Sequence, residues 1–319
     1  MKKSAAMNVK VKQIIMAAML ALSLAACSYN ATDVAAENYY TFTDHSGNNV
    51  ILNRKPQKVA VLFSSFADIW VTAGGKIDIT VAETVERGFA AETAVLVDSG
   101  AGKSINTELL VASEPDFVIC SADIAAQQET AKLLRTAGVP CAEFRVENFE
   151  DYLDVLKICT DITGKTENYT TYGTDIQNNI EQLVENVDTQ TENRKILFIR
   201  AGSSGSATKA KTADGHFAAA MLKQLGTYNI AENAPVLLDG LSLEEIITQN
   251  PEYIFISVMG DETAAKEYIS SVFSQPEWQV ISAVKNKKYI FLPKEMFQYK
   301  PNSRWDEAYR YLIDIIYEQ

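Results

Sequence analysis

The chain has 319 residues, of which 47% are hydrophobic and 22% charged, a composition typical of a globular protein long enough for two domains. Its net charge of −12 argues against binding to nucleic acid, which favours proteins with basic patches. Residues 1–26 contain four lysines and no acidic residue, so the rest of the chain holds 25 basic and 41 acidic residues and is more acidic still, at −16.

The N-terminus has the pattern of an export signal. A basic segment precedes an apolar run, 14–24, which is too short to span a membrane stably. The sequence Leu24-Ala25-Ala26-Cys27 resembles a bacterial lipobox. That resemblance implies a signal peptide at 1–26, a flexible tether at 27–38, and a lipid on Cys27 that anchors the protein to the extracytoplasmic face of a bacterial membrane. An ordinary signal peptide with an incidental cysteine is the alternative.

Strands and helices alternate along the rest of the chain. Predicted strands in the first half lie at 39–42 and 50–52, which form a hairpin, and at 58–63, 79–85, 117–120 and 141–144. Predicted helices there run from the third strand to Trp70, and over 124–136 and 149–162. In the second half the predicted strands lie at 196–200, 253–257 and 288–292, and the helices at 216–225, 243–248, 262–272 and 304–317. This alternation is typical of an α/β fold, so we expect a parallel sheet with helices on both faces in each of two lobes, 39–163 and 190–319.

A long helix is predicted between the two lobes, over 164–189. Its apolar residues recur at spacings of three, four or seven, which places them on one stripe of a helix. These residues are Tyr169, Tyr172, Ile176, Ile180, Leu183, Val184 and Val187. Gly164 is expected to end the preceding helix. At 1.5 Å per residue the long helix would extend about 35 Å, so we interpret it as a rigid span that joins the lobes.

The same short signature occurs once in each lobe, over 106–119 and over 242–256. In both copies a glutamate lies seven residues before a proline, and the proline is followed by an acid, an aromatic residue and a β-forming run. The residue that begins each copy, an Asn or a Ser, is predicted to cap a short helix, which the proline ends. A helix dipole alone favours an acid in the first turn, but two glutamates in matching frames, Glu108 and Glu244, favour a shared role.

This signature, with the order of lipobox, hairpin, lobe, long helix and lobe, resembles the solute-binding proteins of ABC transporters, specifically the class that delivers iron-siderophores, haem and cobalamin. The resemblance covers the chain from about residue 39 to its end. It implies a periplasmic-binding fold with a ligand cleft between two α/β lobes, and no enzymatic activity. It also implies that Glu108 and Glu244 dock onto an ABC permease dimer, which works with an ATPase. The protein would be a monomer with no cofactor of its own, and its ligand a metal chelate such as a ferric siderophore, haem or a corrinoid.

The cleft residues are expected at the C-terminal ends of the strands, where two-lobe binding proteins hold their ligand. They mix aromatic residues with cations, which on an acidic chain suits an anionic and partly aromatic ligand. The candidates are Ser64, Ser65, Phe66, Ser121, Asp123, Arg200, Lys209, Met259, Phe297, Tyr299 and Arg304. Loop lysines are also commonly solvated charges with no ligand, and that alternative stays open. The aromatic residues before Pro301 are expected to project into the cleft, and Trp305 is expected to lie in the core.

Histidine and cysteine limit the metal chemistry. His216 opens a predicted helix near the cleft and could ligate haem iron, although a helix-terminal histidine with no ligand role is the more ordinary interpretation. A site for a bare metal ion needs about three His or carboxylate ligands, so none is predicted. Cys120 and Cys141 are expected at opposite ends of neighbouring parallel strands, too far apart for a disulfide. These two and Cys159 are expected to be buried free thiols.

Two other classes of protein remain as alternatives. A surface hydrolase would need a Ser–His–acid set, in which His216 is the only plausible base. A sensor or adhesin ectodomain could use the same fold without transport.

Overall fold

The computed structural model describes residues 38–98, 104–187 and 194–317. The predicted signal peptide, Cys27 and the tether up to residue 37 lie outside these residues. Residues 40–319 form one compact unit; within it, we call 40–163 the N-terminal lobe and 194–317 the C-terminal lobe. No helix in the described ranges is both long enough and apolar enough to cross a membrane.

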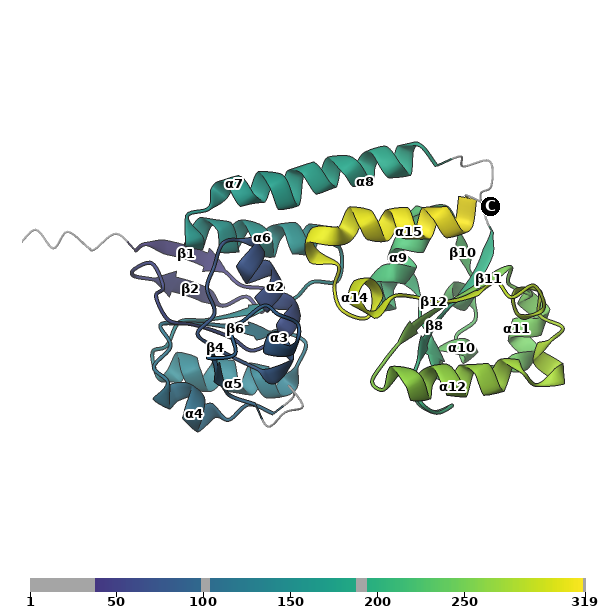
Figure 1. The fold of residues 1–319 in the computed structure, drawn as a ribbon, viewed down its shortest axis with the longest axis horizontal. Coiled ribbons are helices and arrows are strands. Elements are labelled where there is room, and N and C mark those ends of the chain that lie inside the picture. Colours follow the sequence, from purple (N-terminus) through teal and green to yellow (C-terminus); the bar gives the residue numbers. More distant parts are fainter. Residues whose placement is uncertain (1–37, 99–103, 188–193, 318–319) are drawn as a thin grey trace, which may run out of the picture. The chain divides into compact units, whose positions relative to one another are not determined.

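The N-terminal lobe contains a five-stranded parallel sheet in the order β5-β4-β3-β6-β7 (Figure 1). Its strands are β3 (Val59–Val61), β4 (Ile79–Thr80), β5 (Val95–Leu96), β6 (Phe117–Ser121) and β7 (Cys141–Phe144), and β1 (Tyr40–Thr43) pairs with β2 (Asn49–Leu52) as an antiparallel hairpin. Its helices are α2 (Ser64–Thr72), α3 (Ala82–Glu86), α4 (Thr107–Ala112), α5 (Ala125–Thr136) and α6 (Phe149–Thr163). Because side chains alternate along a strand, Val61 and Ile119 pack with α2 and α6, whereas Ala60 and Val118 pack with α4 and α5.

The C-terminal lobe contains parallel strands in the order β10-β8-β11-β12, with β9 antiparallel to β8. The strands are β8 (Lys195–Ala201), β9 (Lys209–Ala210), β10 (Tyr228–Asn229), β11 (Tyr253–Val258) and β12 (Tyr289–Phe291). The helices are α9 (Phe217–Gln224), α10 (Val236–Asp239), α11 (Leu243–Gln249), α12 (Glu262–Phe273) and α13 (Ser282–Lys285), with 3-10 turns η3 (Ala213–Gly215), η4 (Ile230–Asn233) and η5 (Pro276–Trp278). Phe198 and Phe255 pack with α9 on one face, and Ile199 and Ile256 pack with α11 and α12 on the other. The predicted α/β fold is confirmed.

The predicted long helix is present, but it is not a regular α-helix throughout. A π-helical segment, η1 (Thr170–Thr174), joins α7 (Thr166–Tyr169) to α8 (Asp175–Glu185). The wider π turn takes up an extra residue, so Gly173 is buried in place of Tyr172, and the prediction that Tyr172 belongs to the buried stripe is wrong. Ile176 and Ile180 are buried as predicted. The Tyr152 hydroxyl donates to the backbone oxygen of Tyr172 at 2.9 Å, which gives a carbonyl group of the π segment a partner.

The last part of the chain returns from the C-terminal lobe to the N-terminal lobe. Helix α14 (Lys294–Phe297) and a 3-10 turn, η6 (Asn302–Arg304), lead into α15 (Trp305–Tyr317), which packs along α8 (Figure 1). Trp305 is buried, as predicted, and its ring centroid lies 5.9 Å from that of Phe149 in one lobe and 5.5 Å from that of Phe217 in the other. One hydrophobic cluster therefore includes residues of both lobes.

Two expectations for the N-terminal lobe are wrong. The predicted strand 79–85 contains only the two residues of β4, and the helix α3 follows it. Cys120 and Cys141 are not at distant ends of their strands, because Cys141 lies opposite Val118 in the register. Their Sγ atoms are 3.4 Å apart, and both thiols are buried and free. The hydrogen bond between the thiols, together with burial, raises the pKa of Cys120.

Candidate functional site

Each parallel sheet reverses its strand order at one point, between β3 and β6 in the N-terminal lobe and between β8 and β11 in the C-terminal lobe. The loops that follow such a pair of strands leave the sheet on opposite faces and form a crevice between them. Ligands of open α/β sheets bind in this crevice, beyond the C-terminal ends of the strands. The topology therefore agrees with the region that the sequence predicted for the ligand.

A cavity with a volume of ≈ 620 Å³ lies between the two lobes. Its walls come from α2 and α3 and from the segment 294–304, namely Asp68, Glu83, Glu86, Arg87, Phe89, Lys294, Glu295, Tyr299, Lys300, Pro301, Ser303 and Arg304. Asn302 fixes this segment to the N-terminal lobe, because its side-chain amide donates to the Ser65 backbone oxygen (2.9 Å) and to Asp68 Oδ2 (2.8 Å). Its φ of 52° is left-handed, a conformation that Asn tolerates better than most residues. Small-molecule sites in proteins have cavities of this size.

Arg87 stands between aromatic rings in this cavity. Its guanidinium carbon is 3.9 Å from the ring centroid of Tyr299 and 4.8 Å from that of Phe89, so it makes cation–π contacts with both. Its Nη1 donates to Ser64 Oγ at 2.9 Å, and the Ser64 hydroxyl donates in turn to Glu83. Burial lowers the pKa of Arg87 against the opposing effect of nearby acids. The sequence reasoning missed Arg87, because it read the helix that positions this residue as the end of a strand.

The acids of the cavity are partly occupied by other groups. Glu83 accepts from Ser64, and Asp68 accepts from Asn302. Burial raises the pKa of Asp68 although the hydrogen bond with Asn302 acts in the opposite direction. The residues that line the cavity therefore carry about as many acids as cations. The excess of positive charge near the cavity comes from Arg200 and Lys211, which lie around His216.

A group of cations surrounds His216 at the ends of β8 and β11. Burial, and then the charges of Lys300, Arg200 and Lys211, lower the pKa of His216 to about 3, so its ring is neutral at pH 7. Burial also lowers the pKa of Lys300, while acids of the N-terminal lobe act in the opposite direction. Lys300 lines the cavity as well, and therefore connects it to this group. The His216 ring centroid lies 4.7 Å from that of Phe198.

The hydrogen bonds of His216 indicate its tautomer. Nδ1 accepts from the backbone N–H of Ala218 at 3.2 Å, so Nε2 carries the proton and donates to Ser257 Oγ at 3.3 Å. A catalytic serine requires the reverse arrangement, in which the imidazole accepts the hydroxyl proton. This geometry does not support the surface-hydrolase alternative. A haem-ligating role would require Nε2 to give up its proton and its hydrogen bond to Ser257.

The cations around the cavity and His216 have in common that they form no ion pair with the described residues. Across residues 38–98, 104–187 and 194–317, no ion pair involves Arg87, Arg200, Lys209, Lys211 or Lys300. Lys209 even lies opposite Arg200 in the β8–β9 pair, which places like charges side by side. Cations that are partly buried and form no ion pair are costly for the protein, and an anionic ligand would relieve that cost by charge-assisted hydrogen bonds.

Several predicted cleft residues are covered by protein in this structure. These are Ser64, Ser65, Phe66, Ser121 and Phe297. The first three form the first turn of α2, the helix that the sequence predicted after the third strand. Phe297 lies in α14 with its ring centroid 5.7 Å from that of Tyr311, so the expectation that it projects into the cleft is wrong. Ser64 still acts on the cavity through its hydrogen bond with Arg87.

The other predicted cleft residues are at least partly accessible, namely Asp123, Arg200, Lys209, Met259, Tyr299 and Arg304. Two of them already have partners. Asp123 pairs with Arg145 Nε at 2.6 Å, and Arg304 Nε pairs with Glu307 at 2.8 Å. Arg200 and Tyr299 stay candidates for ligand contact, because Arg200 forms no ion pair in the described part of the chain and Tyr299 lines the cavity.

Glu108 and Glu244 are exposed in the first turns of α4 and α11. Asn106 caps α4 as predicted, because its Oδ1 accepts from the backbone N–H of Leu109 at 3.0 Å. The side chain of Ser242 makes no capping hydrogen bond, so the matching prediction for α11 is wrong.

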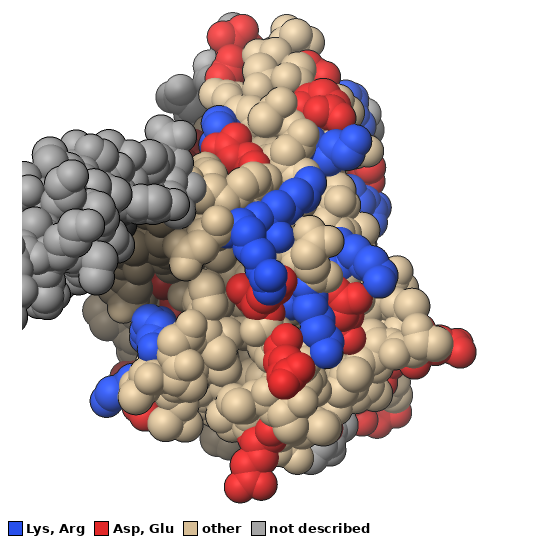
Figure 2. Space-filling view, turned by 90° about the vertical axis from the view of Figure 1, so that its left-hand side faces the viewer, with Lys and Arg blue, Asp and Glu red and all other residues tan. Residues whose placement is uncertain are grey.

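Figure 2 shows Lys and Arg side chains, with Asp and Glu side chains among them, on the face that lies at the left-hand side of Figure 1. Two lysines outside the cleft have contacts of a different kind. Lys55 and Lys165 lie at the C-terminal ends of helices: the Lys55 ammonium donates to the backbone oxygen of Thr163, and Lys165 packs against Gly74. Cations at helix C-termini are stabilised by the helix dipole. The positions of these two lysines are therefore explained by the helix dipole.

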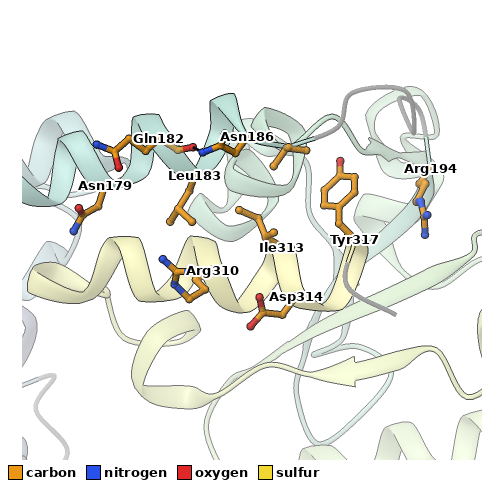
Figure 3. Close-up of a pocket in the computed structure, with 10 residues that line it drawn as sticks. Asn179, Gln182, Leu183, Asn186, Arg194, Arg310, Ile313, Asp314 and Tyr317 are labelled. Carbon is orange, nitrogen blue, oxygen red and sulfur yellow. Dashed lines mark hydrogen bonds between the residues drawn. The ribbon is translucent and has the colours of Figure 1, made fainter.

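A further cavity, of ≈ 650 Å³, lies between α8 and α15 (Figure 3). Its lining combines Leu183 and Ile313 with polar residues such as Asn179. Arg194, which also lines it, directly precedes β8, so this cavity adjoins the N-terminal edge of the sheet rather than the edge where ligands bind. It is not our candidate ligand site.

Comparisons with known proteins agree with this architecture. Residues 59–296 match the family described as periplasmic binding proteins. The chain is similar to the molybdate-binding protein MolA of Haemophilus influenzae, with 21% identity over 312 residues that cover 89% of this chain and 84% of that protein. In structure it is similar to Staphylococcus aureus SirA complexed with staphyloferrin B (TM-score 0.63, 18% identity, 88% of this chain and 97% of that one). It is also similar to the periplasmic haem-binding protein RhuT of Roseiflexus sp. RS-1 (TM-score 0.66, 15% identity, 82% of this chain and 98% of that one). The chain, as its sequence indicated, belongs to the periplasmic binding protein family.

Proposed function

We propose that the protein is the lipid-anchored solute-binding component of an ABC importer and that it captures an anionic metal chelate between its lobes. The observation that carries this proposal is a set of cations at the facing ends of the two lobes that form no ion pair within the described ranges, with Arg87 on one side and Arg200, Lys211 and Lys300 on the other. A ferric siderophore combines negative charge with flat aromatic groups that Tyr299 could contact. Haem or a corrinoid is the alternative within the same class.

The similar proteins support both a chelate and a smaller anion. SirA is described with a siderophore and RhuT as haem-binding, whereas MolA is described as molybdate-binding. A tetrahedral oxyanion is therefore a second candidate, because unpaired cations would hold it equally well. The volume of ≈ 620 Å³ and the ring of Tyr299 beside Arg87 favour the larger chelate.

A titration of the purified protein distinguishes these ligands. Haemin, a ferric tris-catecholate, cyanocobalamin and sodium molybdate are added in turn while tryptophan fluorescence and the visible spectrum are recorded. Arg87→Met and Lys300→Met should each weaken binding of the preferred anion by at least about tenfold, because each removes one charge-assisted contact. Lys157→Met, which removes a cation that pairs with Asp161, is the matched control. Tight binding that neither cleft variant alters would contradict the proposed site.

Glu108 and Glu244 are the proposed contacts with the permease dimer. Both carboxylates are exposed, and within the described ranges neither forms an ion pair. Replacing both with Ala should abolish uptake and leave ligand affinity intact. Glu245→Ala is the control, because its carboxylate already accepts from Gln249 at 2.9 Å. Loss of ligand affinity in the double variant would sink the docking assignment.

The remaining parts of the proposal concern attachment and motion. Cys27→Ser should release the protein from the membrane fraction, and a variant that stays bound would argue against lipidation. We propose a monomer that closes only slightly around its ligand, since α15 packs along α8, which belongs to the helix that joins the lobes. A strong contraction in solution scattering on ligand addition would contradict small closure.

Full function after deletion of the permease would favour the sensor or adhesin alternative.

A further inference from the structure

The two helices that carry the proposed docking glutamates, α4 and α11, correspond residue by residue. Residues 106–117 and 242–253 have the same frame, and each leads into the strand that pairs with the first strand of the parallel sheet in its lobe, β6 beside β3 and β11 beside β8. In each copy the residue before the proline has a left-handed backbone, with φ of 48° at Glu114 and 49° at Asn250. The correspondence of the signatures therefore extends from sequence to backbone.

The same frame also fixes which apolar side chains are buried. Two residues after each glutamate, Leu110 and Ile246 have no exposed surface. One residue further on, Val111 and Ile247 are 43% and 40% exposed. The buried pair holds each helix on its sheet, and the exposed pair faces solvent.

Helix geometry places each exposed aliphatic residue beside a glutamate. Residues at i and i+3 are neighbours on a helix surface, so Val111 adjoins Glu108 and Ile247 adjoins Glu244. A single exposed aliphatic residue is ordinary. Val111 and Ile247 occupy the same position of a repeated frame, and each lies next to an exposed glutamate that forms no ion pair with any described residue. They therefore form a matched pair of half-sites.

We propose that Val111 and Ile247 are contact residues for the permease dimer, so that each half-site consists of a carboxylate and an adjacent aliphatic side chain. This rests on the proposed docking of Glu108 and Glu244. A two-fold permease would present the same surface twice, a basic group next to an apolar patch. The glutamates steer and orient the encounter, and the aliphatic residues add water-excluding contact at its centre.

Salt separates the two contributions. Ion pairs at an interface weaken as salt rises, whereas burial of aliphatic surface does not. Binding of the processed chain to the cognate transporter in nanodiscs is measured at 50 and 500 mM salt. Val111→Ser with Ile247→Ser should weaken binding on the order of tenfold at both salt concentrations, from lost aliphatic burial. Glu108→Ala with Glu244→Ala should weaken it mainly at low salt and flatten its salt dependence.

Two exposed aliphatic residues outside the frame provide the control. Leu133 is 58% exposed and Val280 61%, and Leu133→Ser with Val280→Ser should leave transporter binding unchanged. Val111→Thr keeps the shape of the side chain and Ile247→Thr removes one methyl group from it, so this pair tests the same contact with a smaller change if the serine variant is poorly folded. Unchanged binding of the serine and threonine variants, with binding lost in the glutamate variant, would overturn this inference and leave the proposed function standing. Unchanged binding in all of these variants would overturn both.

Discussion

Trp305 and Trp70 offer a direct test of how the lobe junction is stabilised. Both indoles are buried in the same hydrophobic cluster. Trp70 Nε1 donates to the backbone oxygen of Lys76 at 2.9 Å. Trp305 Nε1 is buried and has no hydrogen-bond partner among the described residues. The two Trp→Phe substitutions remove similar volumes, so they differ mainly in whether a hydrogen bond is lost.

The magnitudes follow from this difference. Trp305→Ala should lower the free energy of unfolding by about 3–5 kcal/mol, because it empties a site between Phe149 and Phe217. Trp305→Phe should be much milder, since it removes an N–H group that is buried without a partner. Trp70→Phe should cost about 1–2 kcal/mol more than Trp305→Phe, because it leaves the Lys76 carbonyl without its donor.

Urea unfolding followed by far-UV circular dichroism gives the three free energies, and thermal unfolding gives a second measure at roughly 2–4 °C per kcal/mol. Trp278→Ala is the control for a large aromatic residue outside the junction, since Trp278 belongs to a cluster of the C-terminal lobe alone. A Trp305→Phe variant less stable than Trp70→Phe would refute the reasoning about the indole N–H groups.

Three further predictions concern other groups. Affinity for the anionic ligand should fall with rising pH sooner than for an exposed lysine, because burial lowers the pKa of Lys300 and only its protonated form attracts the anion; titrations from pH 6 to 10 measure this. Cys120 and Cys141 should resist a thiol reagent until urea unfolds the protein, because both are buried and the pKa of Cys120 is raised. Gly75→Ala should cost about 1–3 kcal/mol from overpacking, since an added Cβ would lie 2.2 Å from the Trp70 ring; urea unfolding measures it.

Each of these predictions has an outcome that would contradict it. A pH profile unchanged in Lys300→Met would assign the titration to another group. Fast labelling of the native thiols would contradict their burial. Gly240→Ala is the control for Gly75, because an added Cβ there has nothing within 4 Å; equal losses for both would exclude crowding by Trp70 as the cause.

Local patterns predicted most of the fold. Gly164 ends α6 with a φ of 73°, as its place after the helical pattern suggested. The π segment could not be predicted, because Tyr172 has an ordinary helical spacing and the shift to Gly173 depends on packing against Leu153 and Leu156. Contact between Cys120 and Cys141 depends on strand register, which side-chain periodicity alone does not specify.

The candidate site was predicted only in part. The topology-based expectation that ligand residues follow the strands led to Arg200 and Tyr299. Burial within that region could not be predicted, because Phe66 and Phe297 are inward-facing residues of short helices whose direction depends on tertiary packing. Arg87 was missed because the predicted strand was extended to Val85, and only the observed helix α3 brings the Arg87 guanidinium to Tyr299.

The shared hydrophobic cluster has a consequence for how the chain matures. Phe149 is made before Trp305, and more than half of the C-terminal lobe lies between them in the sequence, yet their rings pack together in the folded protein. The N-terminal lobe therefore cannot complete its core until α15 has been made. A product truncated before α15 would leave Phe149 and Phe217 uncovered together, which would make it a target for proteases that remove unfinished proteins.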